Sequence, residues 1–249
     1  SPSATVLLER GDEPQEPQEP VCPQCHGVGF VHPMGSKGQP DHSKLVPCPR
    51  CSSQSAAARL RNLRDSGIPE AKRGCTFASL TTESRLMTAL EDARLLATGQ
   101  GDFRLLLIYG GRGGGKTKLA YAAGLEAIDC GRKVRYHQVG SLMLRMRRAM
   151  NSRDRGHSSD DILEQLEECD LLILAELGSE QGTDWDQNVL EVLINQRYAE
   201  ERDTLVTTQQ DLTEMNPYIL DRFSDAAISR RVYLPAPVPR NGEGIMARR

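Results

Sequence analysis

The feature that most constrains the fold is the octapeptide GGRGGGKT at residues 110–117. The apolar run LLLIY comes directly before it, and the helical pattern KTKLAYAAGLEAI begins within it. The octapeptide fits GxxxxGK[ST] between a strand and a helix, where glycines let successive N–H groups turn toward an anion and the helix N-terminus adds partial positive charge. A glycine-rich turn that happens to precede Lys-Thr is the alternative. We expect a loop that cradles the phosphates of a purine nucleoside triphosphate.

The loop is expected to contact both the phosphates and the metal ion of the bound nucleotide. Lys116 would reach the β- and γ-phosphates, and the hydroxyl of Thr117 would bind Mg²⁺. The residues expected to contact the nucleotide are Gly110, Gly111, Arg112, Gly113, Gly114, Gly115, Lys116, Thr117 and Lys118.

Strand and helix patterns alternate from Phe103 onward. Parallel strands are buried on both faces, so they read as short apolar runs, whereas the helices show an apolar stripe. Such alternation predicts an α/β fold, a parallel sheet with helices on both faces. We expect strands at 105–109, 133–139, 171–177 and 204–208, helices at 116–128, 141–150, 160–170 and 185–201, and then a short helix, an Arg-containing segment and a Pro-rich tail.

The strand LLILAEL at residues 171–177 lacks an expected acidic residue. Proteins with this loop normally place a carboxylate at the end of a neighbouring strand, where it holds Mg²⁺. Here Ala175 and Glu176 follow the apolar run, and Asp170 lies at the other end of the strand. Glu176 can polarise an attacking water, but a methyl group cannot hold a metal ion. We expect nucleotide binding with impaired hydrolysis.

Four of the seven cysteines form two CxxC pairs. Cys22 and Cys25 are separated by a 22-residue interval from Cys48 and Cys51. This spacing is typical of a structural zinc site with four thiolates, and the metal would supply folding energy to so small a module. Unligated thiols or a redox pair are the alternatives.

The formal net charge of −3 excludes binding of nucleic acid by bulk basicity. A local basic patch exists at residues 145–155, RMRRAMNSRDR. It fits either a solvated helix face or a contact with the phosphates of single-stranded DNA.

No apolar run has the roughly 18–20 residues of a membrane helix, and no basic segment precedes an apolar one at the N-terminus. We expect a cytoplasmic protein in a reducing compartment.

These motifs together resemble the DnaC/DnaI helicase loaders and the related IstB-type ATPases of the AAA+ class. The resemblance covers most of residues 21–235. SGIPEAKRGCTF before the loop, and AELG followed by the LINQRY helix, are narrower signals than the phosphate loop. Other matching segments are CPQCHGVGF, PCPRC, LLLIYGGRGGGKTKLA, GRKVRYHQVGSLM and TLVTTQQDL.

The resemblance implies a P-loop AAA+ three-layer α/β/α domain that binds ATP, hydrolyses it and self-associates. It implies an N-terminal zinc module that binds a DnaB-type replicative helicase. By carry-over, Glu176 is the catalytic carboxylate, Gln209 the polar sensor, and Arg230 reaches a neighbouring subunit's nucleotide, although Arg230 and Arg231 also fit an ordinary surface pair. Single-stranded DNA would contact Arg145, Arg147 and Arg148.

Three positions depart from the family pattern. Ala175 replaces a metal-binding Asp, Gln209 stands where Asn is usual, and Ala226 where an Arg is usual. All three weaken the case for efficient hydrolysis. Besides a helicase loader, a transposition helper ATPase and a largely non-hydrolysing helicase-binding protein therefore remain open.

The sequence also suggests an order of domains. We expect a disordered N-terminal segment (1–20), a zinc module (21–56), a helical linker (57–80), the AAA+ domain (81–240) and a C-terminal tail (241–249).

Overall fold

The computed structural model describes residues 30–32, 46–47, 52–80, 86–151, 159–179 and 183–236. The chain divides into two compact units, residues 1–57 and 58–249. In the first unit, β1 (Phe30–Val31) pairs antiparallel with β2 (Val46–Pro47). The four cysteines predicted to bind zinc lie outside the described residues. No helix in the described part of the chain is long and apolar enough to cross a membrane.

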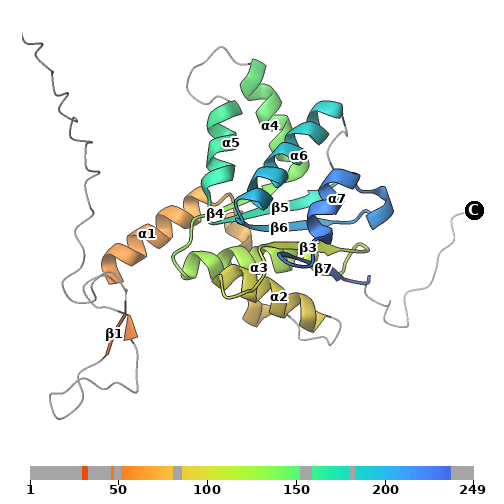
Figure 1. The fold of residues 1–249 in the computed structure, drawn as a ribbon. Helices are drawn as coiled ribbons and strands as arrows, with labels where there is room; N and C mark the ends of the chain where they lie inside the picture. Colours follow the sequence, from red (N-terminus) through yellow and green to blue (C-terminus); the bar gives the residue numbers. More distant parts are fainter. Residues whose placement is uncertain are drawn as a thin grey trace, which may run out of the picture. The chain divides into compact units, whose positions relative to one another are not determined.

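The second unit is built on a five-stranded parallel sheet (Figure 1). Its order is β4-β5-β6-β3-β7, so β3 lies between β6 and the edge strand β7. All neighbouring strands run parallel, and their carboxyl ends therefore lie at the same edge. The strands are β3 (Leu105–Tyr109), β4 (Val134–Gln138), β5 (Leu171–Leu177), β6 (Asp203–Thr208) and β7 (Ser229–Tyr233).

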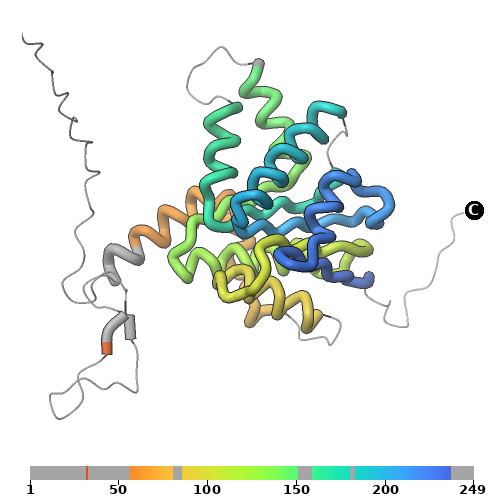
Figure 2. Tube along the Cα trace, in the orientation of Figure 1, coloured from red at the N-terminus to blue at the C-terminus, as the bar shows by residue number. Residues whose placement is uncertain are grey.

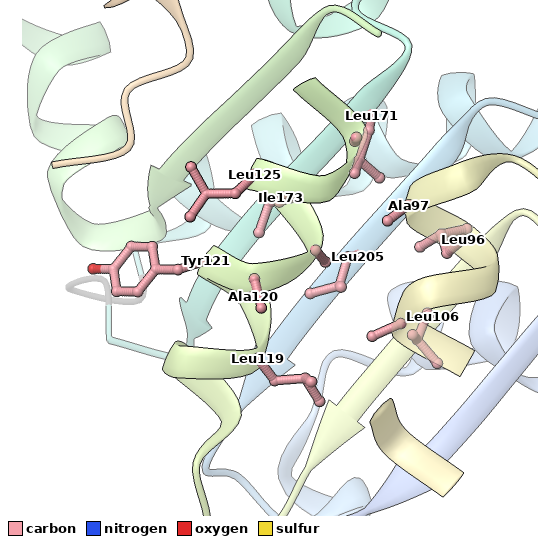
Figure 3. Close-up of a cluster of buried hydrophobic side chains, with 14 of the residues drawn as sticks. Leu96, Ala97, Leu106, Leu119, Ala120, Tyr121, Leu125, Leu171, Ile173 and Leu205 are labelled. Atoms are coloured by element: carbon pink, nitrogen blue, oxygen red, sulfur yellow. The ribbon is translucent and has the colours of Figure 1, made fainter. Parts of the chain in front are cut away.

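Helices cover both faces of this sheet, which confirms the predicted three-layer α/β/α arrangement (Figure 1). On one face, α2 (Met87–Thr98) and α3 (Lys116–Asp129) pack against alternate residues of the strands. Figure 3 shows part of this core, in which Leu119 and Ala120 of α3 belong to one cluster with Ile173 and Leu205 of the sheet. The opposite face carries four helices, of which α4, α5 and α6 lie side by side (Figures 1 and 2). These four are α4 (Val139–Asn151), α5 (Ser159–Glu168), α6 (Asp184–Ala199) and α7 (Pro217–Ser224).

Shorter elements join these layers. The helix α1 (Ser52–Asp65) spans the boundary between the two units, and two single-turn helices follow it before α2. A third single turn lies between β6 and α7. The three turns are η1 (Glu70–Lys72), η2 (Phe77–Ser79) and η4 (Leu212–Glu214).

The sequence missed the strand β7. The sequence predicts only an Arg-containing segment at residues 229–233, SRRVY, because two adjacent arginines do not resemble a buried parallel strand. The segment can be a strand because it lies at the sheet edge, where Arg230 and Arg231 keep contact with solvent. The four predicted strands are present within one residue of their expected ends.

One buried arginine joins α6 to the end of α5 and to the start of β6. Arg197, in α6, is 0% exposed and has no carboxylate partner among the described residues. Its guanidinium donates instead to carbonyl oxygens at the end of α5 and to the start of β6. The acceptors are the carbonyls of Leu166 (2.8 Å), Glu167 (2.9 Å), Cys169 (3.1 Å) and Asp203 (2.7 Å) and the Thr204 hydroxyl (2.9 Å). Burial lowers the pKa of Arg197, and the cation is held by these oxygens.

Replacing this arginine should strongly destabilise the second unit. Arg197→Met keeps most of the side-chain volume but leaves several buried carbonyl groups unpaired. We expect the free energy of unfolding to fall by about 3 kcal/mol or more, because each unpaired buried acceptor costs roughly 1–3 kcal/mol. Urea denaturation measures the change. Arg64→Met, at a residue whose side chain is 75% exposed, is the control and should change stability by less than about 0.5 kcal/mol. A loss below about 1 kcal/mol for Arg197→Met would contradict this role.

Candidate functional site

The glycine loop lies at the carboxyl edge of the sheet, between β3 and α3. Gly115 is the N-cap residue of α3 with φ of 92°, and Gly113 has φ of 78°. Gly110 has φ of 126°, and a Cβ at this position would lie 2.2 Å from the Leu234 carbonyl oxygen. Only glycine tolerates both the backbone conformation and this close approach.

The loop borders a cavity of about 270 Å³. The carboxyl ends of β3, β5 and β6 supply its walls, which is the usual ligand position in an open parallel sheet. The lining residues are Arg112, Gly113, Gly114, Gly115, Lys116, Thr117, Lys118, Glu176, Thr207, Thr208 and Gln209.

Lys116 is held inside the loop. It is 7% exposed, and its Nζ donates to the carbonyl oxygens of Gly110 and Gly111, both at 2.7 Å. Burial lowers the pKa of Lys116, while the nearby Glu176 carboxylate acts in the opposite direction. A bound phosphate would replace or share these carbonyl contacts with stronger charge-assisted ones.

Glu176 reaches the cavity through an irregular backbone. The pairing of β5 with β6 shifts register between Leu174 and Leu177, and Glu176 has φ of 62°. Its backbone N–H donates to the Thr207 hydroxyl at 3.1 Å. Such a bulge re-aims a side chain, and positive φ at a non-glycine residue is a local strain that the surrounding structure must hold. No local pattern in the sequence indicates this irregularity.

Ala175 is fully buried on the α3 face of β5, in the same apolar cluster as Leu119 and Ala120. It therefore points to the side of the sheet where α3 begins, but it offers no oxygen to a cation. Thr117 has a suitable hydroxyl in the cavity, and Glu176 is the carboxylate among the lining residues. These side chains fit a nucleotide phosphate better than a complete magnesium site, which needs several oxygen ligands.

Gln209 lies beside the loop, where the resemblance placed a polar sensor. Its Oε1 accepts a hydrogen bond of 2.8 Å from Nε of Arg112. Sequence analysis missed two more lining residues at the end of β6, Thr207 and Thr208. The Thr207 hydroxyl holds the backbone of Glu176, and the Thr208 hydroxyl donates to the Leu177 carbonyl at 2.8 Å. The polar run TTQQ at the carboxyl end of a buried strand is the sequence signal that could have identified both threonines as lining residues.

Arg230 lies far along β7 from the loop. It pairs in register with Leu106, near the start of β3, whereas Tyr233 pairs with Tyr109 directly before the loop. Its guanidinium donates to Asp92 (2.7 Å) and Asp102 (2.6 Å) and lies over a phenylalanine ring. The two carboxylates raise the pKa of Arg230. Within one chain, Arg230 thus serves these acidic partners and not the cavity.

The three arginines predicted to bind DNA lie on α4 and differ in their surroundings. Arg145 and Arg148 are exposed. Arg147 is used internally: it pairs with Asp186, donates to the Thr183 hydroxyl at 2.9 Å and lies over the Trp185 ring. Asp186 is completely buried and belongs to the capping box of α6. Arg147 therefore anchors the start of α6, whereas Arg145 and Arg148 have exposed side chains; the predicted DNA contact of all three arginines stays a prediction.

Comparison with known families agrees with this geometry. The IstB-like ATP binding protein family matches residues 81–247, which include the whole cavity. The chain belongs to the IstB-like ATP-binding family. The predicted resemblance to DnaC-type members of this family is confirmed by the relatives described next.

Curated relatives of this IstB-like chain include a replication protein and a mobile-element protein. The replicative helicase loader DnaC of Escherichia coli (strain K12) is 26% identical over 167 residues, which cover 66% of this chain and 67% of DnaC. A putative insertion sequence ATP-binding protein of Sinorhizobium fredii is 29% identical over 178 residues, 70% of this chain and 57% of that protein.

Solved structures show the same fold. The DnaC helicase loader superposes with a TM-score of 0.58 at 17% identity, over 67% of this chain and 99% of that one. AMPPCP-bound DnaA from Aquifex aeolicus gives a TM-score of 0.57 at 21% identity, over 64% of this chain. This chain covers 49% of that DnaA chain, so it spans about half its length. The predicted P-loop AAA+ fold is confirmed.

Removing the Lys116 ammonium should abolish tight nucleotide binding. For Lys116→Ala we expect ATP affinity to fall on the order of a hundredfold, because charge-assisted contacts with phosphate are lost. Calorimetric titration of ATP measures the effect, and circular dichroism checks the fold. Lys72→Ala, at an exposed lysine in η1, should bind ATP as the unmodified chain does. Undiminished affinity in Lys116→Ala would show that the loop is not the nucleotide site.

Proposed function

We propose that this chain is an ATP-binding helicase loader, which delivers a DnaB-type replicative helicase to single-stranded DNA in the cytoplasm. The observation that carries the proposal is the match to DnaC over the domain that contains the phosphate loop. The cavity supports the nucleotide part, since Lys116, Thr117 and three glycines of the loop line it at the N-terminus of α3.

The N-terminal cysteines would form the helicase-binding part. Cys22, Cys25, Cys48 and Cys51 have the spacing of one Zn²⁺ site. The β1–β2 pair occupies the interval between the two CxxC sequences. A metal-stabilised module of this size can present a rigid surface to a partner without a large core of its own.

The AAA+ unit would respond to ATP by assembling and by contacting DNA. Arg145 and Arg148 offer exposed positive charge on α4 for single-stranded DNA. Arg230 would approach the nucleotide of a neighbouring copy, in which case its guanidinium must leave or share Asp92 and Asp102. ATP in this proposal acts mainly as a signal for assembly, because hydrolysis is weakened at Ala175.

A pull-down with a DnaB-type helicase tests the partner. The full chain should contain about one zinc ion and retain the helicase. Cys22→Ser combined with Cys48→Ser should lose both zinc and helicase, because two of the four ligands are missing. Cys130→Ser, at an exposed cysteine of the AAA+ unit, is the matched control and should keep both. Zinc-loaded protein that does not retain the helicase would exclude the loader role.

Turnover measurements test the role of Ala175. Ala175→Asp should raise the ATP hydrolysis rate about tenfold or more, because a carboxylate near the phosphates can hold the metal that neutralises developing charge. Ala175→Asn introduces a side chain of nearly the same shape as Asp but without its charge, so its ATP hydrolysis should remain slow. If Ala175→Asp leaves turnover unchanged, the missing carboxylate does not limit hydrolysis. Fast DNA-stimulated turnover by the unmodified chain would also exclude a non-hydrolysing helicase-binding protein.

A transposition helper ATPase is the second candidate. The family match and the insertion sequence relative from Sinorhizobium fredii favour it. Such a protein would prefer duplex DNA and form ATP-dependent filaments on it, whereas a helicase loader would prefer single strands. Binding to matched single-stranded and duplex oligonucleotides, with and without ATP, separates the two functions.

A further inference from the structure

Arg112 is the one loop residue between Gly110 and Gly115 that has a side chain. It is exposed at the cavity, and its Nε donates to Gln209 Oε1 at 2.8 Å. Arg112 belongs to the loop after β3, and Gln209 follows β6, so the bond joins two walls of the cavity. The contact uses one of the five N–H groups of the guanidinium, and both terminal nitrogens keep donors for a further acceptor.

The charge of the residues that line the cavity favours a phosphate as the further acceptor for Arg112. Three cationic side chains line it, Arg112, Lys116 and Lys118, against the Glu176 carboxylate. Position 175 adds no negative charge, and no carboxylate of the described residues forms an ion pair with Arg112. The lining therefore carries excess positive charge where a phosphate chain would lie, and a planar guanidinium suits a phosphate with two acceptor oxygens.

We propose that the Arg112 side chain is a ligand for the terminal phosphate of ATP, acting within its own chain, and that Gln209 is the positioning residue that orients it. The inference rests on the proposed ATP binding at this loop. It adds that the site distinguishes ATP from ADP. ADP lacks the terminal phosphate, so Arg112 selects ATP over ADP. Arg112 also neutralises phosphate charge independently of a metal ion, so ATP affinity depends less on Mg²⁺ than in a site with a carboxylate-held metal.

If the Arg112–Gln209 bond had a different role, removing Arg112 would have the opposite effect on ATP affinity. If the bond only stabilises the empty loop, nucleotide must break it, and its removal would strengthen or leave unchanged the binding of ATP. If Arg112 is a phosphate ligand, its removal weakens ATP binding specifically.

Calorimetric titration of the full chain with ATP and ADP, each with Mg²⁺ and with EDTA, distinguishes these outcomes. Arg112→Gln should lower ATP affinity roughly ten- to a hundredfold while ADP affinity changes little, because a charge-assisted contact is lost only for ATP. The loss should be larger in EDTA than in Mg²⁺. Arg112→Lys should retain part of the preference for ATP over ADP. Arg64→Gln removes an exposed positive charge outside the cavity and should retain the whole preference.

Gln209 is tested by a double-mutant cycle. Gln209→Ala should lower ATP affinity less than Arg112→Gln does, and the double variant should bind ATP as Arg112→Gln alone does, because the two residues act as one unit. An additive effect would overturn the positioning role of Gln209. An ATP-to-ADP affinity ratio that is unchanged in Arg112→Gln would overturn the phosphate-ligand role while leaving nucleotide binding intact. Unmodified protein that binds neither nucleotide would overturn the inference together with the proposed function.

Discussion

The parallel direction of the strands is the constraint on which the rest of the structure depends. Because every strand of the sheet runs the same way, the residues after β3, β5 and β6 arrive at one edge. Lys116, Glu176 and Gln209 are distant in sequence but line one cavity for this reason. The buried contacts that position the strands, including those of Arg197 with the end of α5 and the start of β6, therefore also affect the geometry of the site.

The site combines complete phosphate-binding elements with an incomplete set of metal ligands. The glycine loop, Lys116 and Thr117 are all in place, whereas Ala175 is a buried apolar residue that packs with α3. The proposal that ATP acts mainly as a signal for assembly rests on this combination. The proposed contact of Arg112 with the terminal phosphate would add to this signal, because it would distinguish ATP from ADP without hydrolysis.

Sequence reasoning worked where local patterns determine structure and failed where contacts are non-local. LLLIY and LLILAEL are apolar over their whole length, so their positions as β3 and β5 were predictable. β7 was not, because its arginines are tolerated only at a sheet edge. The bond between Arg112 and Gln209 joins residues 97 positions apart, and the positive φ of Glu176 depends on the pairing of β5 with β6. The ion pair between Arg147 and Asp186 joins two different helices, so the sequence alone could not predict it.

The contact between Gly110 and Leu234 has a mechanical consequence. The Leu234 N–H donates to the Tyr109 carbonyl at 2.8 Å, and its own carbonyl lies where a side chain of residue 110 would be. The phosphate loop cannot widen in that direction without pushing the end of β7. A loop that rearranges around nucleotide must therefore either move into the cavity or displace the edge strand. Since that strand also carries Arg230, the same displacement would reach the ion pairs with Asp92 and Asp102 at its far end.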